Sequence, residues 1–452
     1  AHCSPYSPSS RRWLNPTYIG VDAVPEVAAS SNAQAIRNAS EFVAKLESLR
    51  ATEFVDYPRV AEAKEQVLRA AFDTFRTTDS ERYRNFRAWV EGEGEALAAQ
   101  VMWETLQRVN AAEGRVGFAS WPDDQQRPNG AGVRAVVDAN AWLCEYHEYL
   151  QWIASEQLSA AKERAASRGM ALGLYTDLAV GVEGASAERW SRPALYGDGA
   201  SVGAPPDSFN LQGQDWGMPP PIPHALEEEG LQSFREVLSA AMAVSGAVRI
   251  DHVMALRRLY WVPRGRGAAE GAYVLYPFDA MMAVVTLESN RNQCLVVGED
   301  LGVVPPEVTD ALRRSRSYSY RILFFEQTGP ETYKAPDQML TESLTVASTH
   351  DLPTLKGFWE ERDLEVRDEL ELWPSPAVRD QFVLDRAAQR RGLVDALKRQ
   401  GLIEATSEVP RELPQSVADA LLLYIARGAS ELMAVQLEDV MGQLEQVNLP
   451  GT

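Results

Sequence analysis

The sequence has few cysteines and little basic charge relative to acidic charge. Three cysteines, Cys3, Cys144 and Cys294, occur in 452 residues, and no two of them form a C-x-x-C pair. This pattern excludes a disulfide framework and gives no sign of a cysteine-based zinc or redox site. The formal net charge is −20 and no basic cluster stands out. We therefore expect no binding to nucleic acid or to an anionic membrane surface.

Long apolar runs are also absent. No stretch approaches the roughly 20 apolar residues that a membrane-spanning helix needs, and the opening residues AHCSPYSPSSRRW lack the apolar core of a signal peptide. Hydrophobic residues make up 45% of the chain and charged residues 24%, which is ordinary usage for a globular protein. These features predict a soluble, cytoplasmic protein with a sizeable core.

Several catalytic motifs are missing. The chain has no Walker A sequence and no H-E-x-x-H pair. The segment GEGEALA at 92–98 loosely resembles a dinucleotide fingerprint, but it lies among residues of helical spacing and follows no strand. We therefore expect no cofactor and no metal ion.

The order of apolar patterns predicts the fold class. Apolar residues recur at helical spacing from about 34 to 166, and later residues form short apolar runs separated by amphipathic helices. Six such runs are strand candidates: 171–182, 247–251, 294–300, 321–326, 343–351 and 431–439. Strands alternating with helices predict an α/β protein with a parallel sheet. Between 183 and 223 lies a long Gly- and Pro-rich segment whose aromatic residues favour a functional loop over a disordered one.

Three carboxylates fall at the ends of predicted strands: Asp251 in RIDH, Glu299 in VVGED and Asp351 in STHD. The carboxyl ends of barrel strands meet at one mouth, where catalytic residues lie. Cleavage of a glycosidic bond requires two acidic groups: one protonates the leaving oxygen and the other attacks the anomeric carbon. A third can stabilise the charge that develops on the sugar ring.

Neighbouring residues indicate separate roles for these acids. Arg249 lies two positions before Asp251, so on a strand both point to the same side, and the guanidinium would keep Asp251 ionised. The apolar surroundings of Glu299 would raise its pKa and suit it to general acid catalysis. His252 and His350 adjoin two of the acids and could donate hydrogen bonds to sugar hydroxyls.

Other interpretations stay open at this point. The pair Arg249 and Asp251 could be a structural ion pair. Asp300 could be the working acid in place of Glu299, because adjacent strand positions face opposite ways. The histidines could be core residues or, less in keeping with the absence of H-x-H and H-E-x-x-H spacing, metal ligands. The aromatic residues of 183–223 could simply pack on the rest of the protein.

Seven motifs together resemble the 4-alpha-glucanotransferases called amylomaltases, or disproportionating enzymes, of glycoside hydrolase family 77, in their longer bacterial maltodextrin-pathway form. These motifs are SPYSPSSRRWLNPTYI, GLYTDLAVGV, SVGAPPDSFNLQGQDWGMPP, RIDHVMALRRLYWVP, VVGEDLG, STHDLPT and QVNLPGT, and they run nearly end to end. The resemblance implies a retaining (β/α)₈ TIM barrel of the alpha-amylase type with a large helical insertion. It further implies three segments: a barrel-mouth segment at 1–33, a helical insertion at 34–168, and barrel strands three to eight at 169–452.

The resemblance also assigns site residues. It implies Asp251 as nucleophile, Glu299 as general acid/base and Asp351 as transition-state stabiliser. The remaining residues that it places near substrate are Tyr6, Asp177, Asp207, Gln214, Trp216, Arg249, His252, His350 and Asn448. The expected substrates are maltodextrins and other α-1,4-glucans.

The sequence departs from the family in one respect. The two barrel strands that precede SPYSPSS in this family are not found, which agrees with the count of six strand candidates. The chief alternatives to a glucanotransferase are an α-glucan hydrolase and an inactive maltodextrin-binding fragment. A metal-dependent isomerase on a barrel is disfavoured because no histidine and carboxylate ligand pattern occurs.

Overall fold

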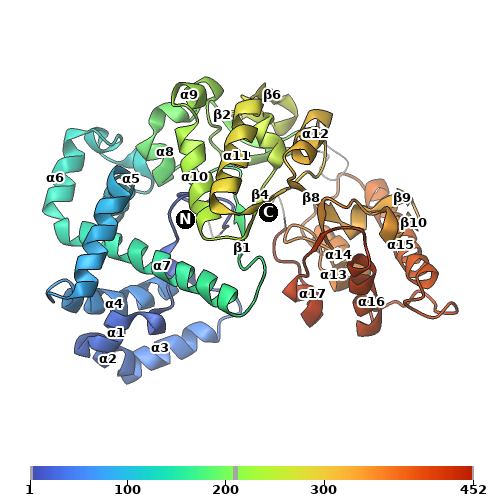
Figure 1. Ribbon diagram of the computed structural model, residues 1–452, viewed down its shortest axis with the longest axis horizontal. Helices are drawn as coiled ribbons and strands as arrows, with labels where there is room; N and C mark the ends of the chain where they lie inside the picture. Colours follow the sequence, from blue (N-terminus) through green and yellow to red (C-terminus); the bar gives the residue numbers. More distant parts are fainter. Residues whose placement is uncertain (1–3, 207–211, 450–452) are drawn as a thin grey trace. The chain divides into compact units, whose positions relative to one another are not determined.

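The computed structural model describes residues 4–206 and 212–449 of the chain (Figure 1). The chain divides into two compact units. Unit 1 comprises Ala1–Gly203, Asp215–Val248 and Leu259–Cys294, and unit 2 comprises Ala204–Gln214, Arg249–Arg258 and Leu295–Thr452. Among the described residues, none of the helices combines the length and apolar character that crossing a membrane requires.

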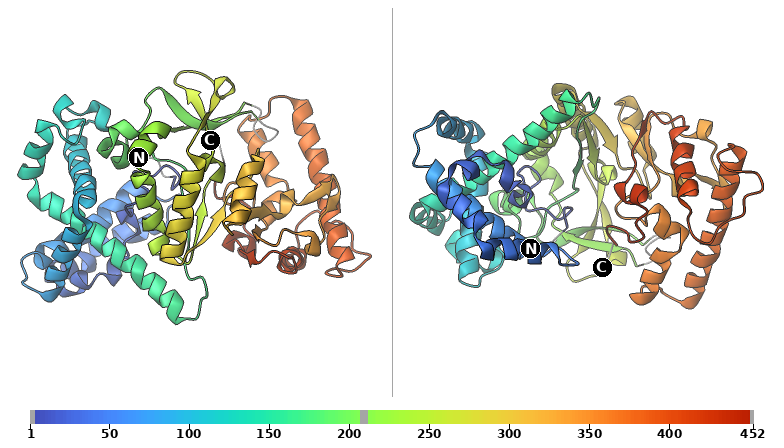
Figure 2. Two further views of the ribbon diagram at one scale, coloured as in Figure 1. Left: turned by 45° about the horizontal axis from the view of Figure 1, so that its top comes forward. Right: turned by 90° about the horizontal axis from the view of Figure 1, so that it is seen from below.

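Unit 1 begins with a block of helices, drawn in blue to cyan-green in Figure 2. They are α1 (Pro25–Ala29), α2 (Ser31–Asn38), α3 (Ser40–Arg50), α4 (Tyr57–Phe75), α5 (Glu81–Ala112), α6 (Ala131–Ala139) and α7 (Ala141–Ser167). The helical spacing predicted for 34–166 is therefore confirmed, although α2 begins before residue 34. Rings from α4, α5 and α7 fill the core, with Phe72, Phe86 and Tyr149 fully buried.

A four-stranded sheet in unit 1 has the order β3-β2-β5-β6. Its strands are β2 (Ala200–Ala204), β3 (Gln214–Met218), β5 (Arg258–Pro263) and β6 (Ala272–Leu275). The segment 183–223 thus supplies two of the strands, and it also contains helix α8 (Ala187–Ser191). Two of its aromatic residues, Trp190 and Tyr196, are buried at 0% and 4% exposure, so these two pack as core residues.

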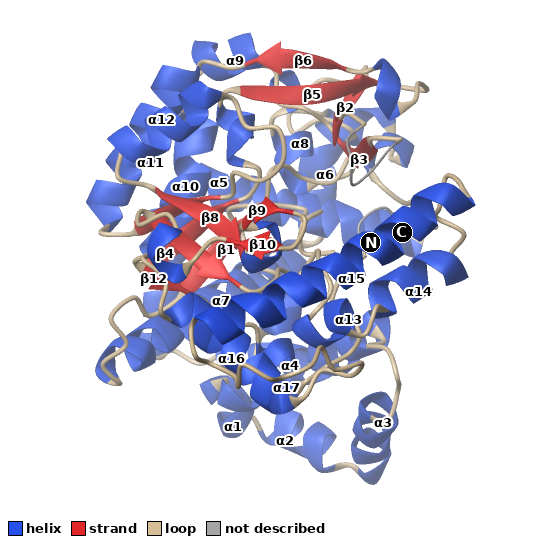
Figure 3. Ribbon diagram, turned by 90° about the vertical axis from the view of Figure 1, so that its right-hand side faces the viewer, coloured by secondary structure: helices blue, strands red, loops and turns tan. Residues whose placement is uncertain are grey.

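Six strands of a second sheet match the six predicted runs. They are β1 (Tyr175–Leu178), β4 (Ala247–Ile250), β7 (Leu295–Gly298), β8 (Tyr318–Ile322), β11 (Ser343–Val346) and β12 (Leu432–Met433), and their order is β1-β4-β7-β8-β11-β12. Figure 3 draws strands in red and labels β1, β4, β8 and β12 of this sheet. The α/β prediction is therefore confirmed. Two of the runs extend into helices. The run 321–326 leaves the strand at Ile322, and Leu323–Phe325 form a 3-10 helix. The run 431–439 contains only Leu432–Met433 as strand, and a helix begins at Leu437. Leu323 and Phe324 are as buried as the strand, so apolarity alone does not separate the two conformations.

Helices connect these strands. Unit 1 contributes α9 (Pro223–Glu228), α10 (Gln232–Ala243) and α11 (Phe278–Asn292); unit 2 contributes α12 (Pro306–Arg314), α13 (Leu355–Trp359), α14 (Arg362–Glu369), α15 (Pro376–Arg399), α16 (Gln415–Ala426) and α17 (Leu437–Met441). Two short strands of unit 2, β9 (Gln327–Gly329) and β10 (Thr332–Tyr333), form a separate antiparallel pair.

The unit 2 strands β7, β8, β11 and β12 are parallel to one another. Strand β7 pairs with β8, β8 with β11, and β11 with β12, each in parallel register. Their apolar faces meet helices α13, α15 and α16 in one core that includes Val297, Val346, Trp359 and Leu397. Because parallel strands end at the same edge of a sheet, residues that follow β7 and β11 are delivered to one edge.

Candidate active site

The candidate nucleophile follows β4 directly. Arg249 lies within β4 and its Nη1 is 2.9 Å from Oδ1 of Asp251, which is the first residue after the strand. The Arg249 side chain is 8% exposed and that of Asp251 is 19% exposed. A guanidinium this close to a carboxylate in a largely buried setting favours the ionised carboxylate. The structure therefore places the two side chains on one side of the chain, as their spacing predicts.

Glu299 is buried at the end of β7. The residue is 7% exposed, and its carboxylate accepts hydrogen bonds from the main-chain N–H of His252 at 2.9 Å and of Leu301 at 2.7 Å. Burial raises the pKa of Glu299 to about 7; the positive charge of Arg249 opposes that rise and the negative charge of Asp251 adds to it. At neutral pH this carboxyl group can therefore both give and take a proton.

Asp351 lies beyond the end of β11. Its Oδ2 is 3.0 Å from Nε2 of His350, and its Oδ1 accepts a hydrogen bond of 2.5 Å from Nδ2 of Asn448. Burial acts to raise the pKa of Asp351, but the hydrogen bonds and charge of these neighbours, together with Arg249, outweigh it and hold the pKa below its ordinary value. Asp351 is therefore an ionised carboxylate, with a side chain that is 41% exposed.

Arg249 links the three acids electrostatically. Its charge forms the ion pair with Asp251 and also lowers the pKa of Glu299 and of Asp351. The guanidinium lies 5.6 Å from the centre of the Tyr320 ring, which comes from β8. Two ionised carboxylates and one carboxyl with a pKa near neutrality thus surround a single buried cation, an arrangement that separates acid and base roles.

His252 has an unusual backbone conformation. Its φ of 44° and ψ of 61° lie in the left-handed region, which a residue with a side chain adopts at a cost. Burial lowers the pKa of His252 to about 4, with further lowering by the charges of Arg258 and Arg249. The imidazole is therefore neutral at pH 7, while its main-chain N–H is directed at Glu299.

Asp300 is held by a neighbouring strand. Its carboxylate accepts hydrogen bonds from Ser319 Oγ at 2.9 Å and from the main-chain N–H of Tyr320 at 2.9 Å, and Arg321 contacts both carboxylate oxygens at 3.2 and 3.0 Å. The Asp300 side chain is 1% exposed. Asp300 thus accepts four hydrogen bonds, two of them from a guanidinium, whereas Glu299 accepts two from main-chain N–H groups; this favours Glu299 over Asp300 as the residue that exchanges protons with a substrate.

The other predicted residues lie in different parts of the chain. In unit 1, the hydroxyl group of Tyr6 donates a hydrogen bond to the carboxylate of Asp177 on β1. Gln214 begins β3, and Trp216 lies two residues further along the same strand. Asp207 lies outside the described residues. The roles of these five residues toward a substrate stay predictions.

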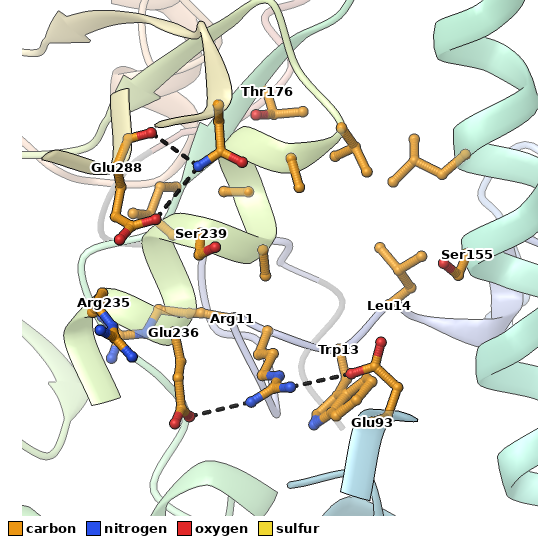
Figure 4. Close-up of a pocket in the computed structure, with 18 of the residues that line it drawn as sticks. Arg11, Trp13, Leu14, Glu93, Ser155, Thr176, Arg235, Glu236, Ser239 and Glu288 are labelled. Carbon is orange, nitrogen blue, oxygen red and sulfur yellow. Dashed lines mark hydrogen bonds and ion pairs between the residues drawn. The ribbon is translucent and has the colours of Figure 1, made fainter. Parts of the chain in front are cut away.

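Unit 1 contains a cavity of about 700 Å³, shown in Figure 4. It is lined by the segment from Arg11 to Leu14 and by residues of α5, α7, α10, α11 and β1. Charged groups in its wall are paired: Arg12 forms ion pairs with Glu93 at 3.1 Å and with Glu236 at 3.2 Å. Of the predicted site residues only Asp177 lines it.

The sequence did not point to the residues that support this site. Tyr320 and Arg321 on β8 contact Arg249 and Asp300, and Leu301 contributes only its main chain. Arg321 carries one usable signal, since it is a charged residue inside an apolar strand. Among the described residues, no group of three His, Cys, Asp or Glu side chains is placed to hold a metal ion.

Comparisons with known proteins agree on one family. A sequence model of the glycoside hydrolase family 77, described as 4-alpha-glucanotransferase, matches residues 1–452. The chain is 36% identical over 464 residues to a 4-alpha-glucanotransferase of Haemophilus influenzae and 36% identical over 459 residues to one of Mycobacterium tuberculosis. It covers 66% and 61% of those proteins, and 99% of this chain is aligned in each case.

Two solved structures are similar in fold. The crystal structure of amylomaltase from Corynebacterium glutamicum has a TM-score of 0.86 and 32% sequence identity, and the match covers 99% of this chain and 62% of that one. Amylomaltase from Streptococcus agalactiae, in complex with acarbose, has a TM-score of 0.76 and 18% identity, covering 99% of this chain and 83% of that one. This chain thus spans less than two thirds of the length of the curated relatives described above.

Proposed function

Since the chain belongs to the 4-alpha-glucanotransferase family, glycoside hydrolase family 77, we propose that it provides the catalytic acids of an enzyme that moves α-1,4-glucan segments between maltodextrins. The observation that carries this proposal is the contrast between two neighbouring carboxyl groups. Asp251 is paired with Arg249 at 2.9 Å, whereas burial raises the pKa of Glu299 to about 7. One group is thereby suited to attack and the other to proton transfer.

The first step forms a covalent intermediate. A carboxylate oxygen of Asp251 attacks the anomeric carbon of the donor glucan as the glycosidic C–O bond breaks, and Glu299 gives its proton to the departing oxygen. The electron pair of the broken bond stays on that oxygen, and a β-linked glycosyl enzyme results. Retaining enzymes need the two carboxyl groups roughly 5 to 5.5 Å apart, and their mutual influence on pKa supports a close approach.

The second step transfers the sugar. The Glu299 carboxylate takes the proton from the 4-hydroxyl group of an acceptor glucan, whose oxygen attacks the anomeric carbon and releases Asp251. Asp351, ionised and held by His350 and Asn448, stabilises the positive charge that develops on the ring in both steps. His252 and His350 present imidazoles to the sugar hydroxyls.

Substrate binding would extend to residues beyond the acids. Tyr6, Asp177, Asp207, Gln214 and Trp216 are proposed to contact the glucan chain, and Trp216 offers a ring for stacking on a sugar. Exclusion of water by the segment 183–223 would favour transfer over hydrolysis. The proposed substrates are maltodextrins and other α-1,4-glucans.

A product analysis with maltotriose tests the proposal. The full natural protein should convert maltotriose to glucose and a ladder of longer maltodextrins, and the Glu299→Gln variant should leave maltotriose unchanged. Short products with a steady rise in reducing ends would instead indicate an α-glucan hydrolase. Maltotriose left intact by the wild-type protein would refute both activities and favour a binding role.

A further inference from the structure

We propose that Asp300 is a positioning residue that fixes the direction of the acid/base Glu299 through its anchorage to strand β8; this rests on the proposed function. Asp300 is a buried carboxylate that the two chemical steps do not use. Its side chain is 1% exposed. A buried charge is retained at a cost unless its partners satisfy it, and here every partner comes from β8.

The anchorage begins where the strand pairing ends. Strands β7 and β8 are in register at Val297 with Tyr318 and at Gly298 with Ser319. Beyond this point the Asp300 carboxylate accepts the main-chain N–H of Tyr320 at 2.9 Å and the hydroxyl of Ser319 at 2.9 Å. The side chain thereby continues the connection between the two strands past the last paired residues.

Arg321 strengthens this connection through a bidentate ion pair with Asp300. Its Nη1 and Nη2 lie 3.2 and 3.0 Å from Oδ1 and Oδ2 of Asp300. A bidentate pair between planar groups fixes orientation as well as distance. The carboxylate of Asp300 therefore has one direction available to it, toward β8.

The consequence reaches Glu299 because the two residues are adjacent just beyond the end of β7. Asp300 bonds to β8, whereas the carboxylate of Glu299 accepts the main-chain N–H groups of His252 and Leu301, so different partners hold the two side chains. The main chain of Glu299 is fixed on the other side: its N–H donates to the carbonyl of Ile250 at 3.0 Å, and its carbonyl accepts from the N–H of Val253 at 3.0 Å. Residues 299 and 300 are thus held from both flanks.

Asp300 also has an indirect connection to the nucleophile. The Tyr320 N–H that it accepts belongs to the residue whose ring lies 5.6 Å from the guanidinium of Arg249. The main effect is nevertheless expected on Glu299, which is one covalent residue away. Proton transfer requires heavy atoms within about 2.6 to 3.2 Å, and a displacement of about 1 Å can cost on the order of a hundredfold in rate.

The test measures the reaction of two sugar donors, maltotriose and α-maltotriosyl fluoride, with the full natural protein and with its Asp300→Asn variant. Maltotriose needs Glu299 to protonate a sugar oxygen, whereas fluoride leaves α-maltotriosyl fluoride with little protonation. We expect kcat/KM for maltotriose to fall at least tenfold and the burst of fluoride release to change less than about threefold. The basic limb of the pH profile should also move, because the surroundings of Glu299 change.

Two further variants complete the design. Arg321→Lys keeps the positive charge but loses the bidentate contact, so a smaller loss in the same direction is expected, and this variant carries the comparison if Asp300→Asn does not fold. Asp310→Asn removes an exposed aspartate of α12 that pairs with Arg313 at 3.1 Å; both donors should react as with wild type.

The outcomes separate this inference from the proposed function. Wild type without transfer from maltotriose refutes the proposed function. The positioning role alone is overturned if the wild-type protein transfers sugar from maltotriose and the Asp300→Asn variant has the same kcat/KM for maltotriose and the same pH profile. Equal losses with both donors also overturn it, because they indicate a general structural role or an action on Asp251.

Discussion

The main-chain N–H of His252 donates a hydrogen bond of 2.9 Å to Oε2 of Glu299. His252 is the residue that follows Asp251, so the candidate nucleophile and the candidate acid/base are joined through one turn of the backbone. The turn is left-handed at His252, with φ of 44°. Backbone conformation at this residue therefore contributes to the geometry of both carboxyl groups.

Comparing His252→Gly with His252→Ala separates the contribution of the backbone conformation from that of the imidazole ring. Both variants lack the ring, but only glycine adopts the left-handed conformation without a steric cost of about 1 to 2 kcal/mol. If the backbone bond to Glu299 matters, His252→Gly should retain kcat up to about tenfold higher than His252→Ala. Steady-state kinetics with maltotriose measure the ratio. Equal kcat values for the two variants would show that only the imidazole is important.

The raised pKa of Glu299 predicts the pH dependence of activity. Glu299 must be protonated for the first step, and burial raises its pKa to about 7. As the pH rises above 7 the fraction of protonated enzyme falls, so kcat/KM for maltotriose should decrease about tenfold per pH unit. A profile that stays flat to pH 9 would contradict the assignment of Glu299 as the acid.

The same pKa predicts that Glu299 reduces the stability of the folded protein. Its pKa is about 7 when folded and 4.5 ordinarily, so the folded state binds more protons between these values and loses stability as the pH rises through them. Glu299→Gln should raise the free energy of unfolding at pH 8 by up to about 3 kcal/mol and have little effect near pH 4. Denaturant unfolding at both pH values measures the difference. Stabilisation of equal size at pH 4 and pH 8 would show that ionisation is not its cause.

His147 predicts acid sensitivity of the helical block in unit 1. Burial lowers the pKa of His147 to about 3, with the charges of Arg108 and Arg69 contributing, and its Nε2 has no hydrogen-bond partner among the described residues. The unfolded chain therefore takes up the proton first, and stability falls as the pH drops from about 6.5 toward 3.

Replacing His147 by leucine should reduce that acid sensitivity. The melting temperature of His147→Leu should change less between pH 7 and pH 4.5 than that of wild type. His224 is exposed on α9, so His224→Gln serves as a control with wild-type behaviour. An unchanged pH dependence in His147→Leu would assign the acid sensitivity to other groups.

Much of the sheet was predictable because buried parallel strands leave continuous apolar runs. Each of the six runs overlaps a strand of the six-stranded sheet, although the run 321–326 overlaps only the last two residues of β8. The four-stranded sheet was not predicted, since its pairing of Val202 with Trp261 joins residues far apart in the sequence. Periodicity along the chain reports local environment and carries no information on such pairing.

The three acids were found because charged residues at the ends of apolar strands are conspicuous. The contacts that orient these acidic side chains were not predictable, because they involve main-chain N–H groups and residues of the neighbouring strand. The spacing of Arg249 and Asp251 predicted the ion pair, whereas the strand pattern of VVGED did not distinguish Glu299 from Asp300 and only the family resemblance implied Glu299. That distinction requires Arg321, whose approach to Asp300 is a property of the β7–β8 register.

Trapping the glycosyl-enzyme intermediate shows whether Asp251 forms a covalent bond to the sugar. A 5-fluoro-α-maltosyl fluoride should glycosylate the full natural protein, and the glycosyl enzyme should accumulate. The ring fluorine slows both steps, whereas the anomeric fluoride is a good leaving group and speeds only the first. Mass spectrometry of proteolytic peptides should find the added sugar on Asp251, and the Asp251→Asn variant should remain unlabelled. A label on Glu299, on Asp351 or on any other residue would contradict the account.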